Sequence, residues 1–237
     1  MNLYFCTAKN KTVGKNKHRK FADNEAFENM VQAPRTDLLE KGLPLKGKWH
    51  KEFFKNDKPI VLELGCGKGE YTVGLGELFT NKNFIGIDIK GARMWCGART
   101  ATDNKMYNIG FLRTHIELIH NCFAKGEVSE IWITFPDPQI KYRRRKKRLT
   151  APDMLDMYRQ ILTEDAIIHL KTDSQFLHGY TLGILEGYGH KVLDSSYDID
   201  RQKADNELLK IRTNYEGIFR DKGMTITYIK FQLSKLD

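Results

Sequence analysis

Long apolar runs are missing from this sequence of 237 residues. No stretch approaches the roughly 20 apolar residues that a membrane-spanning helix needs. The first 20 residues, MNLYFCTAKNKTVGKNKHRK, also lack the apolar segment of a secretory signal. We therefore expect a cytoplasmic protein that has no membrane partner.

Cysteine is scarce as well. A disulfide framework or a zinc site needs cysteine or histidine ligands at set spacings. The sequence has no CxxC motif, and its four cysteines are scattered, with no paired histidine nearby: Cys6, Cys66, Cys96 and Cys122. We interpret them as reduced thiols and expect no metal site.

Acidic residues are outnumbered: 39 Lys and Arg stand against 30 Asp and Glu, for a net charge of +9 and a pI of about 9.2. This excess favours a polyanionic partner, with nucleic acid as the first candidate. The alternative is a basic protein without such a partner. The first 20 residues carry several of these charges and few apolar anchors, so we expect an arm that stays disordered until it meets a partner.

The stretch IVLELGCGKGEY, residues 60–71, is the most informative part of the chain. Its apolar run at 60–64 predicts a buried strand of a parallel sheet, and a helical pattern follows over about 70–79. Alternating glycines at 65, 67 and 69 let the backbone turn sharply and let a ligand approach closely. Strand, glycine loop and helix together are typical of the first crossover in a nucleotide-binding sheet.

Two acids suggest which nucleotide is bound. A P-loop needs Lys-Ser or Lys-Thr after its last glycine, but Glu-Tyr follows here. Glu63 stands at the tip of the first strand, and Asp88 ends the second, 23 residues after Gly65, where an acid can accept hydrogen bonds from ribose hydroxyls. A binding site with two carboxylates suits a ligand that carries an amine and a sulfonium better than one that carries phosphates. We predict S-adenosylmethionine, bound by Glu63, Gly65, Gly67 and Asp88; NAD fits less well, and a glycine turn made for packing alone is the alternative.

The remaining pattern predicts an α/β fold with a doubly wound, mostly parallel sheet. Further strands are expected at 83–88, 109–113, 130–135 and 166–171, and further helices near 21–30, 91–103, 115–124, 152–162 and 174–187. Two late strand-like runs, 190–195 and 224–233, are joined by a polar segment too short for a long crossover helix. We expect them to close the sheet as an antiparallel hairpin.

The loop after the fourth strand reads TFPDPQ, residues 134–139. Its two prolines fix the backbone on both sides of Asp137, and a rigidly held acid suits a substrate-orienting residue. The alternative is a proline-rich turn in which Asp137 is an Asx cap. The eight residues KYRRRKKR at 141–148, one residue further on, include seven basic ones. Such runs are commonly solvated faces or localisation signals, but this position favours a clamp on nucleic-acid phosphates.

Five motifs in order, LELGCGKGEY, FIGIDI, the FPDP loop with its basic segment, KTD at 171–173 and TNYE at 213–216, carry a family resemblance. Residues 55–237 resemble the tRNA (guanine-N7-)-methyltransferases of the bacterial type. The resemblance implies a methyltransferase domain over 55–237, preceded by a basic arm and lead-in over 1–54. It also implies methyl transfer from S-adenosylmethionine to N7 of a guanine in the tRNA variable loop, position 46 in tRNA numbering.

The resemblance also assigns site residues. Asp137 would be catalytic and contact both cofactor and substrate. The substrate would further contact Lys141, Asp173, Thr213, Asn214, Tyr215 and Glu216. The family usually has an acid after the third strand, where this chain has Thr114-His115, so His115 or Glu117 would accept from the adenine amino group. For Asp173 the alternative is a helix N-cap before Ser174.

The chemistry restricts what Asp137 can do. Guanine N7 has a lone pair and no proton, so methyl transfer to it needs no general base. The carboxylate could accept N1–H and N2–H of guanine and favour the positive charge that develops on the base. The A-form major groove is deep and narrow, so the guanine must lie in a loop or be flipped out.

Three other functions remain open at this stage. A small-molecule methyltransferase on the same fold would leave the basic run without a purpose. An amino methyltransferase of DNA or RNA would have N/D-P-P followed by an aromatic residue, and here Gln follows Asp137-Pro138. A non-catalytic RNA-binding protein could keep the fold without binding the cofactor. We expect a monomer or a homodimer.

Overall fold

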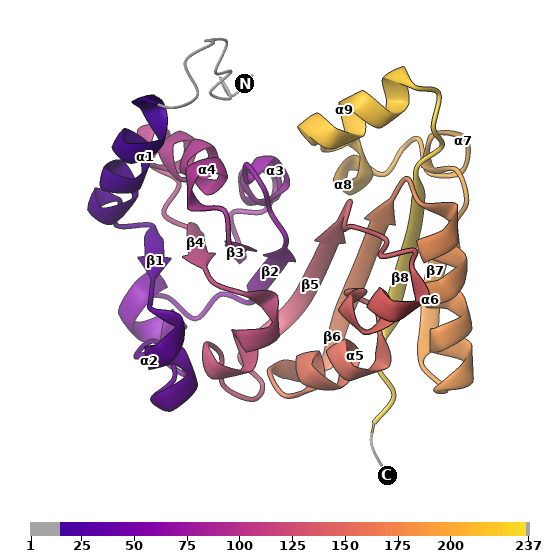
Figure 1. Cartoon of the computed structure of the whole chain (residues 1–237), viewed down its shortest axis with the longest axis horizontal. Helices are drawn as coiled ribbons and strands as arrows, with labels where there is room; N and C mark the ends of the chain where they lie inside the picture. Colours follow the sequence, from indigo (N-terminus) through magenta and orange to yellow (C-terminus); the bar gives the residue numbers. More distant parts are fainter. Residues whose placement is uncertain (1–14, 236–237) are drawn as a thin grey trace. The chain divides into compact units, whose positions relative to one another are not determined.

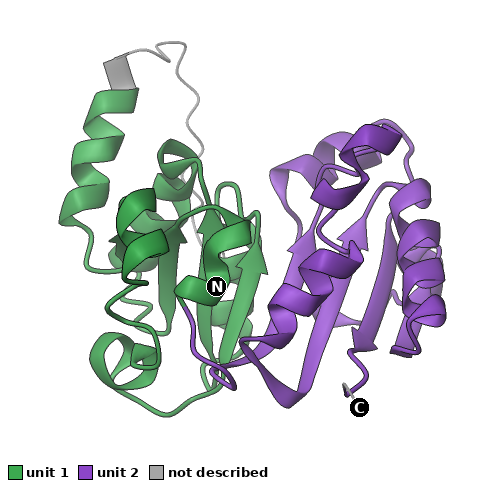
Figure 2. Ribbon diagram, turned by 60° about the horizontal axis from the view of Figure 1, so that its bottom comes forward, with its two compact units in different colours: residues 1–122 green, residues 123–237 purple. Residues whose placement is uncertain are grey.

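The computed structural model describes residues 15–235 (Figure 1). The chain forms two compact units, Met1–Cys122 and Phe123–Asp237 (Figure 2). The predicted boundary between a lead-in over 1–54 and a domain over 55–237 stays a prediction.

Unit 1 is built on four parallel strands in the order β1-β4-β3-β2. The strands are β1 (Met30–Gln32), β2 (Ile60–Leu64), β3 (Asn83–Asp88) and β4 (Ile109–Arg113). The helices are α1 (Lys15–Ala26), α2 (Arg35–Glu40), a π-helix η1 (Trp49–Phe54), α3 (Glu70–Leu78), α4 (Gly91–Asp103) and a 3-10 helix η2 (Ile116–Asn121). Strands β2, β3 and β4 match the sequence prediction.

Helices cover both faces of this sheet. Successive residues of β4 point to opposite faces, so Phe111 and Gly110 each contact a different helix. On one face, Phe111 lies so close to Gly97 of α4 that a Cβ there would come within 2.6 Å of its ring. On the other face, a Cβ at Gly110 would come within 2.6 Å of Phe53 of η1. Glycine at these positions lets the helices pack directly on the sheet.

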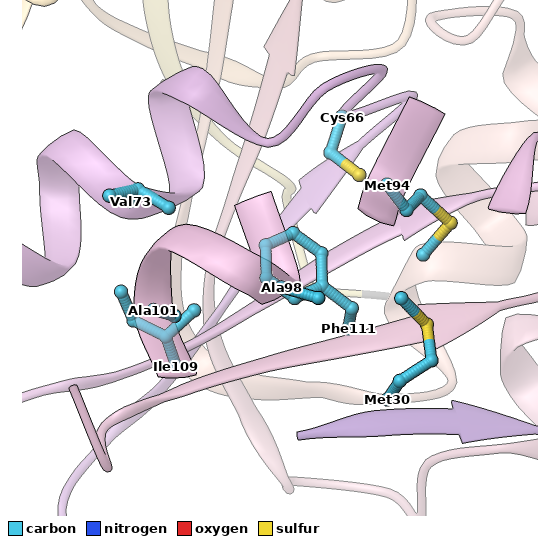
Figure 3. Packing of buried hydrophobic residues seen from close by; sticks show 8 residues of the cluster. All are labelled: Met30, Cys66, Val73, Met94, Ala98, Ala101, Ile109 and Phe111. Carbon is cyan, nitrogen blue, oxygen red and sulfur yellow. The ribbon is translucent and has the colours of Figure 1, made fainter. Parts of the chain in front are cut away.

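The core of unit 1 gathers around Phe111, which is fully buried (Figure 3). Met30 of β1 belongs to the same cluster, although it comes from the segment predicted as a lead-in. Burying a methionine side chain stabilises a fold by about 2 kcal/mol. Strand β1 is therefore an integral edge of the sheet in unit 1.

The predicted disordered arm, residues 1–20, lies partly outside the described residues. Within them, Lys15–Ala26 is helical, which corrects both the arm and the helix expected at 21–30. The reason is Trp95 of α4, whose indole N–H donates to Asp23 at 2.8 Å and whose ring lies 4.7 Å from Lys20 Nζ. A tertiary contact thus orders a stretch that has little apolar pattern of its own.

Unit 2 has four strands in the order β5-β6-β8-β7. The strands are β5 (Val128–Thr134), β6 (Leu162–Thr172), β7 (Lys191–Ser196) and β8 (Thr227–Gln232). The helices are a 3-10 helix η3 (Tyr142–Lys147), α5 (Pro152–Arg159), α6 (Gln175–Gly187), α7 (Ile199–Gln202), α8 (Glu207–Lys210) and α9 (Asn214–Asp221). β5 and β6 are parallel, whereas β8 is antiparallel to both β6 and β7.

The predicted fold class is confirmed. Parallel strands alternate with helices, and an antiparallel pair, β7 and β8, closes the sheet of unit 2 (Figure 1). The polar segment between these strands holds three short helices and no long crossover, as expected. A second helix needs correction: the α-helix expected near 115–124 is the shorter η2, in which Leu118 N–H donates to the carbonyl of His115, three residues back.

Candidate functional site

The loop after β2 turns on three left-handed glycines, Gly65 (φ 78°), Gly67 (φ 57°) and Gly69 (φ 75°). A Cβ at Gly65 would meet nothing within 4 Å, and one at Gly67 would meet only the Gly65 carbonyl oxygen, at 4.0 Å. At Gly69 it would lie 2.5 Å from Phe111 Cε1. The first two glycines therefore expose backbone that a ligand can approach, and the third serves packing.

Glu63 is the last residue but one of β2 and is almost completely buried. Its Oε2 accepts a hydrogen bond from the backbone N–H of Thr72 at 2.8 Å, and another from the Thr72 hydroxyl. The carboxylate thereby satisfies an otherwise unpaired N–H in the first turn of α3. Glu63 fixes the glycine loop between strand and helix and places a negative charge beneath it.

Asp88 holds the same loop from the end of β3. Its Oδ2 accepts from Gly67 N–H at 3.0 Å, and its Oδ1 accepts from Lys90 N–H at 2.8 Å. Burial raises the pKa of the neighbouring Cys66 thiol well above its ordinary value, and the charges of Glu63 and Asp88 raise it further. The loop is therefore electronegative, which suits a cationic ligand.

His115 lies at the rim of a cavity of about 670 Å³ within unit 1. Ile89 and Thr114, which follow β3 and β4, line the same cavity. Both His115 and Glu117 are exposed to solvent. The lining of this cavity includes His115 but not Glu117; which of the two contacts the adenine stays a prediction.

In unit 2, the loop after β5 is strained around Asp137. Phe135 and Gln139 have positive φ angles of 48° and 47°, which non-glycine residues rarely adopt. Asp137 is exposed, and its Oδ1 accepts from Gln139 N–H at 3.0 Å. The Asx turn considered as the alternative does form, and it holds an exposed carboxylate in a defined orientation.

A buried ion pair lies behind this loop. Lys171 and Glu216 are both fully buried, with Nζ and Oε2 2.8 Å apart. Nζ also donates to the carbonyls of Leu209 and Ile211, while Oε1 of Glu216 accepts from Arg220 at 2.8 Å. Burial lowers the pKa of Lys171 to about 8, against the opposing effect of Glu216.

This ion pair connects three predicted site segments. The Lys171 carbonyl accepts from Phe135 N–H at 2.8 Å, which fixes the start of the Asp137 loop at the end of β6. The Lys171 side chain donates hydrogen bonds to the carbonyls of Leu209 and Ile211, and so holds the segment that precedes α9. Asp173, two residues further along, is partly buried, and this burial raises the pKa of its carboxyl.

The predicted substrate residues of α9 differ in their surroundings. Thr213 is the N-cap and accepts from Glu216 N–H at 3.1 Å, Asn214 and Tyr215 are exposed, and the Glu216 carboxylate is internal. In the same way, Ser174, not Asp173, caps α6, by accepting from Leu177 N–H at 3.2 Å. The Asp173 carboxylate is therefore not used as the cap.

The basic run also divides into two parts. Residues 141–147, including Lys141, are all exposed, and most of them form η3. Arg148 is buried, at 6% exposure, and donates to the carbonyl oxygen of Gln139. The run presents a basic surface, but its last residue points inward.

Sequence reasoning missed Thr72, Arg148, Arg220 and the buried role of Lys171. For Lys171 a signal exists: it interrupts the apolar strand AIIHL at 166–170, where a charge needs a buried partner. The partner, 45 residues away, has no comparable signal. Within residues 15–235, no group of three or more His, Cys, Asp or Glu could hold a metal ion, and no helix there is long and apolar enough to cross a membrane.

Comparisons with known proteins agree with this geometry. Residues 57–229 match a family described as putative methyltransferase. The tRNA (guanine-N(7)-)-methyltransferase of Christiangramia forsetii is 56% identical, with 92% of this chain and 98% of that protein covered. The protein of the same name from Bacteroides fragilis is 51% identical, with 93% and 87% covered. Among solved structures, the 16S rRNA methyltransferase KamB shares the fold, with a TM-score of 0.60, 14% identity, and 78% and 92% covered.

Proposed function

Because the chain belongs to the tRNA (guanine-N7-)-methyltransferase family, we propose that it methylates N7 of a guanine in tRNA, using S-adenosylmethionine. The target is the variable-loop guanine at position 46 of tRNA numbering. The geometric observation that supports this most directly is the glycine loop of unit 1, which is open at Gly65 and Gly67 and held by two carboxylates. The enzyme acts in the cytoplasm, as a monomer or a homodimer.

The residues of unit 1 suit the methyl donor. S-adenosylmethionine supplies the methyl group from a sulfonium centre and carries an ammonium group and a ribose. The electronegative loop formed by Glu63, Asp88 and the open glycines favours both positive charges, and Asp88 also accepts from ribose hydroxyls. The adenine is contacted by His115, which lines the cavity, or by the exposed Glu117.

Asp137 orients the guanine. Its carboxylate accepts N1–H and N2–H of the base, and adenine lacks this pair of donors. The same negative charge favours the charge that develops on the ring as N7 is methylated. No proton has to be removed from N7, so Asp137 acts by positioning and electrostatics, not as a base.

The rest of unit 2 holds the RNA. Lys141 and the other exposed cations of η3 bind backbone phosphates, which position the tRNA without reading its sequence. Asp173, Thr213, Asn214 and Tyr215 close around the base. Glu216 contributes through the α9 segment that it ties to Lys171.

The test is transfer of labelled methyl from S-adenosylmethionine to an unmodified tRNA transcript, with the modified position mapped. Wild type should yield 7-methylguanosine at position 46, and a transcript with adenine at 46 should not be labelled. Asp137→Asn should lose at least about a hundredfold in kcat, because electrostatic stabilisation of this size is common. Asp165→Asn is the control, since Asp165 is exposed in the same unit and should remain fully active.

The outcomes separate the alternatives. Wild type that binds S-adenosylmethionine but labels no tRNA would make the substrate assignment wrong and favour a small molecule. Wild type that binds tRNA but no S-adenosylmethionine, by calorimetry, would leave an RNA-binding protein without activity.

A further inference from the structure

Arg148 differs from every other cation of the basic run. The six others are exposed, whereas only 6% of Arg148 is accessible. Its guanidinium lies over two neighbouring rings of α6, 4.8 Å from the centroid of Phe176 and 4.3 Å from that of Tyr180. A guanidinium held in this way is not available to a phosphate.

The side-chain hydrogen bonds of Arg148 point to the end of the Asp137 loop. Nε and Nη2 donate to the Gln139 carbonyl oxygen at 3.3 and 3.2 Å, and Nη2 lies 3.4 Å from the Ile140 carbonyl oxygen. The planar guanidinium of Arg148 therefore donates to two successive carbonyl oxygens, those of Gln139 and Ile140. Lysine cannot replace this arrangement, because an ammonium group has neither the planar fork of donors nor a flat face that stacks on aromatic rings.

Gln139 links this anchor to the Asp137 carboxylate. Its own N–H donates to Asp137 Oδ1 at 3.0 Å. Its left-handed conformation, with φ 47°, is unfavourable for a residue with a side chain and persists only where the surroundings enforce it. Without Arg148, Gln139 would relax and the Asp137 carboxylate would lose its fixed direction.

We propose that Arg148 is a positioning residue for Asp137 and does not bind tRNA. This inference rests on the proposed function for its effect on turnover. Its structural part, the order of the loop, is independent of any substrate. The two parts can therefore be tested separately.

The turnover test compares Arg148→Lys with the matched variant Arg144→Lys and its neutral partner Arg144→Met. Arg148→Lys should lower kcat roughly tenfold to a hundredfold, the scale expected for a misplaced reacting group. The KM for tRNA and the salt dependence of tRNA binding should not change. Arg144→Met should instead raise the KM and reduce the slope of log K against log salt by about one.

The structural test is amide hydrogen exchange at Gln139, followed by NMR on the full chain. Arg148→Lys should speed exchange at least about tenfold, because the bond to Asp137 is lost, while Arg144→Lys should leave it unchanged. If Arg148→Lys destabilises the whole unit, Tyr180→Leu replaces it, because this variant removes one of the two rings that contact the guanidinium. It should lower kcat and speed exchange at Gln139, each by less than Arg148→Lys does.

Three results would overturn the proposal. They are an unchanged kcat in Arg148→Lys, a reduced salt slope for that variant, and unchanged exchange at Gln139. Wild type that methylates no tRNA would contradict the proposed function alone, since the exchange rates and the salt slope of tRNA binding would still decide the role of Arg148.

Discussion

The loops after β2 and β5 both turn through left-handed conformations, but they reach them in different ways. The first places glycine at each such position, Gly65, Gly67 and Gly69. The second places Phe135 and Gln139 there. Left-handed backbone is free of steric cost for glycine, whereas other residues lose roughly 1–2 kcal/mol each.

The second loop therefore needs support from elsewhere in unit 2. The Lys171 carbonyl holds Phe135 at its start, and Arg148 holds Gln139 at its end. The glycine loop is specified mainly by its own residues and by the two acids at the ends of β2 and β3. The conformation of the loop after β2 is thus set mainly by its own sequence, whereas that of the loop after β5 is set by contacts with residues distant in the chain.

The largest effect is expected where the glycine loop is tightest. In Gly69→Ala, the new Cβ would lie 2.5 Å from Phe111 Cε1 at a φ of 75°. Overpacking and backbone strain together should lower the free energy of unfolding by about 4 kcal/mol, measured by urea titration. Binding of S-adenosylmethionine should be lost as well.

Gly126→Ala is the matched control, because Gly126 has a φ of 76° and nothing within 4 Å of a new Cβ. It should lose only about 1 kcal/mol, the conformational part alone. Equal losses in the two variants would show that contact with Phe111 does not matter.

The second prediction concerns pH and the support of the other loop. Folded Lys171 loses its proton near pH 8, whereas the unfolded chain keeps it to about 10.5. Between these values the unfolded state binds more protons, so the contribution of Lys171 to the free energy of unfolding rises with pH. From pH 8 to 10.5, wild type should gain up to ~3 kcal/mol relative to Lys171→Met.

Urea unfolding at several pH values checks this difference, which cancels the titration of groups that do not contact Lys171. Lys191→Met is the control, because Lys191 is exposed on β7 of the same unit, and its difference from wild type should be flat. A flat difference for Lys171→Met too would mean that the buried lysine keeps its ordinary pKa.

The smallest effect is expected from making the second loop resemble the first. Gln139→Gly removes the left-handed penalty but makes the unfolded chain more flexible, for a net gain of about 0.5 kcal/mol in stability. Turnover should nevertheless fall, because the loop is less rigid. Gln160→Gly, at a residue with a φ of −69°, should only destabilise; a loss of stability in both variants would contradict the strain at Gln139.

The same contrast explains what the sequence could predict. The alternation of strands and helices, and the loop from Gly65 to Gly69, follow from local pattern and appear where expected. The segment 15–20 was expected to be disordered, and η2 was expected as a longer α-helix. The order of segment 15–20 depends on the contacts that Trp95 makes with α1, which no local pattern records.

The candidate site divides in the same way. Asp137, Asp88 and Glu63 stand in short motifs, so their place at strand ends could be predicted. That the Glu216 carboxylate is internal could not, because it depends on Lys171 and Arg220 coming together in the folded unit. Seven basic residues among the eight at 141–148 gave no sign that the last one, Arg148, points inward.

The strand order of unit 2 has a consequence for how the chain can fold during synthesis. β7 lies at the edge of the sheet and pairs with β8, which also separates it from β6 (Figure 1). A nascent chain that has reached residue 196 thus holds β5, β6 and a strand that has nothing to pair with. α6 can pack on β6 at once, but β7 must wait until residues 227–232 emerge and insert between two strands already made. The last strand of the unit is therefore the one that completes its sheet, and a ribosome that stalls before it leaves an open edge on β6.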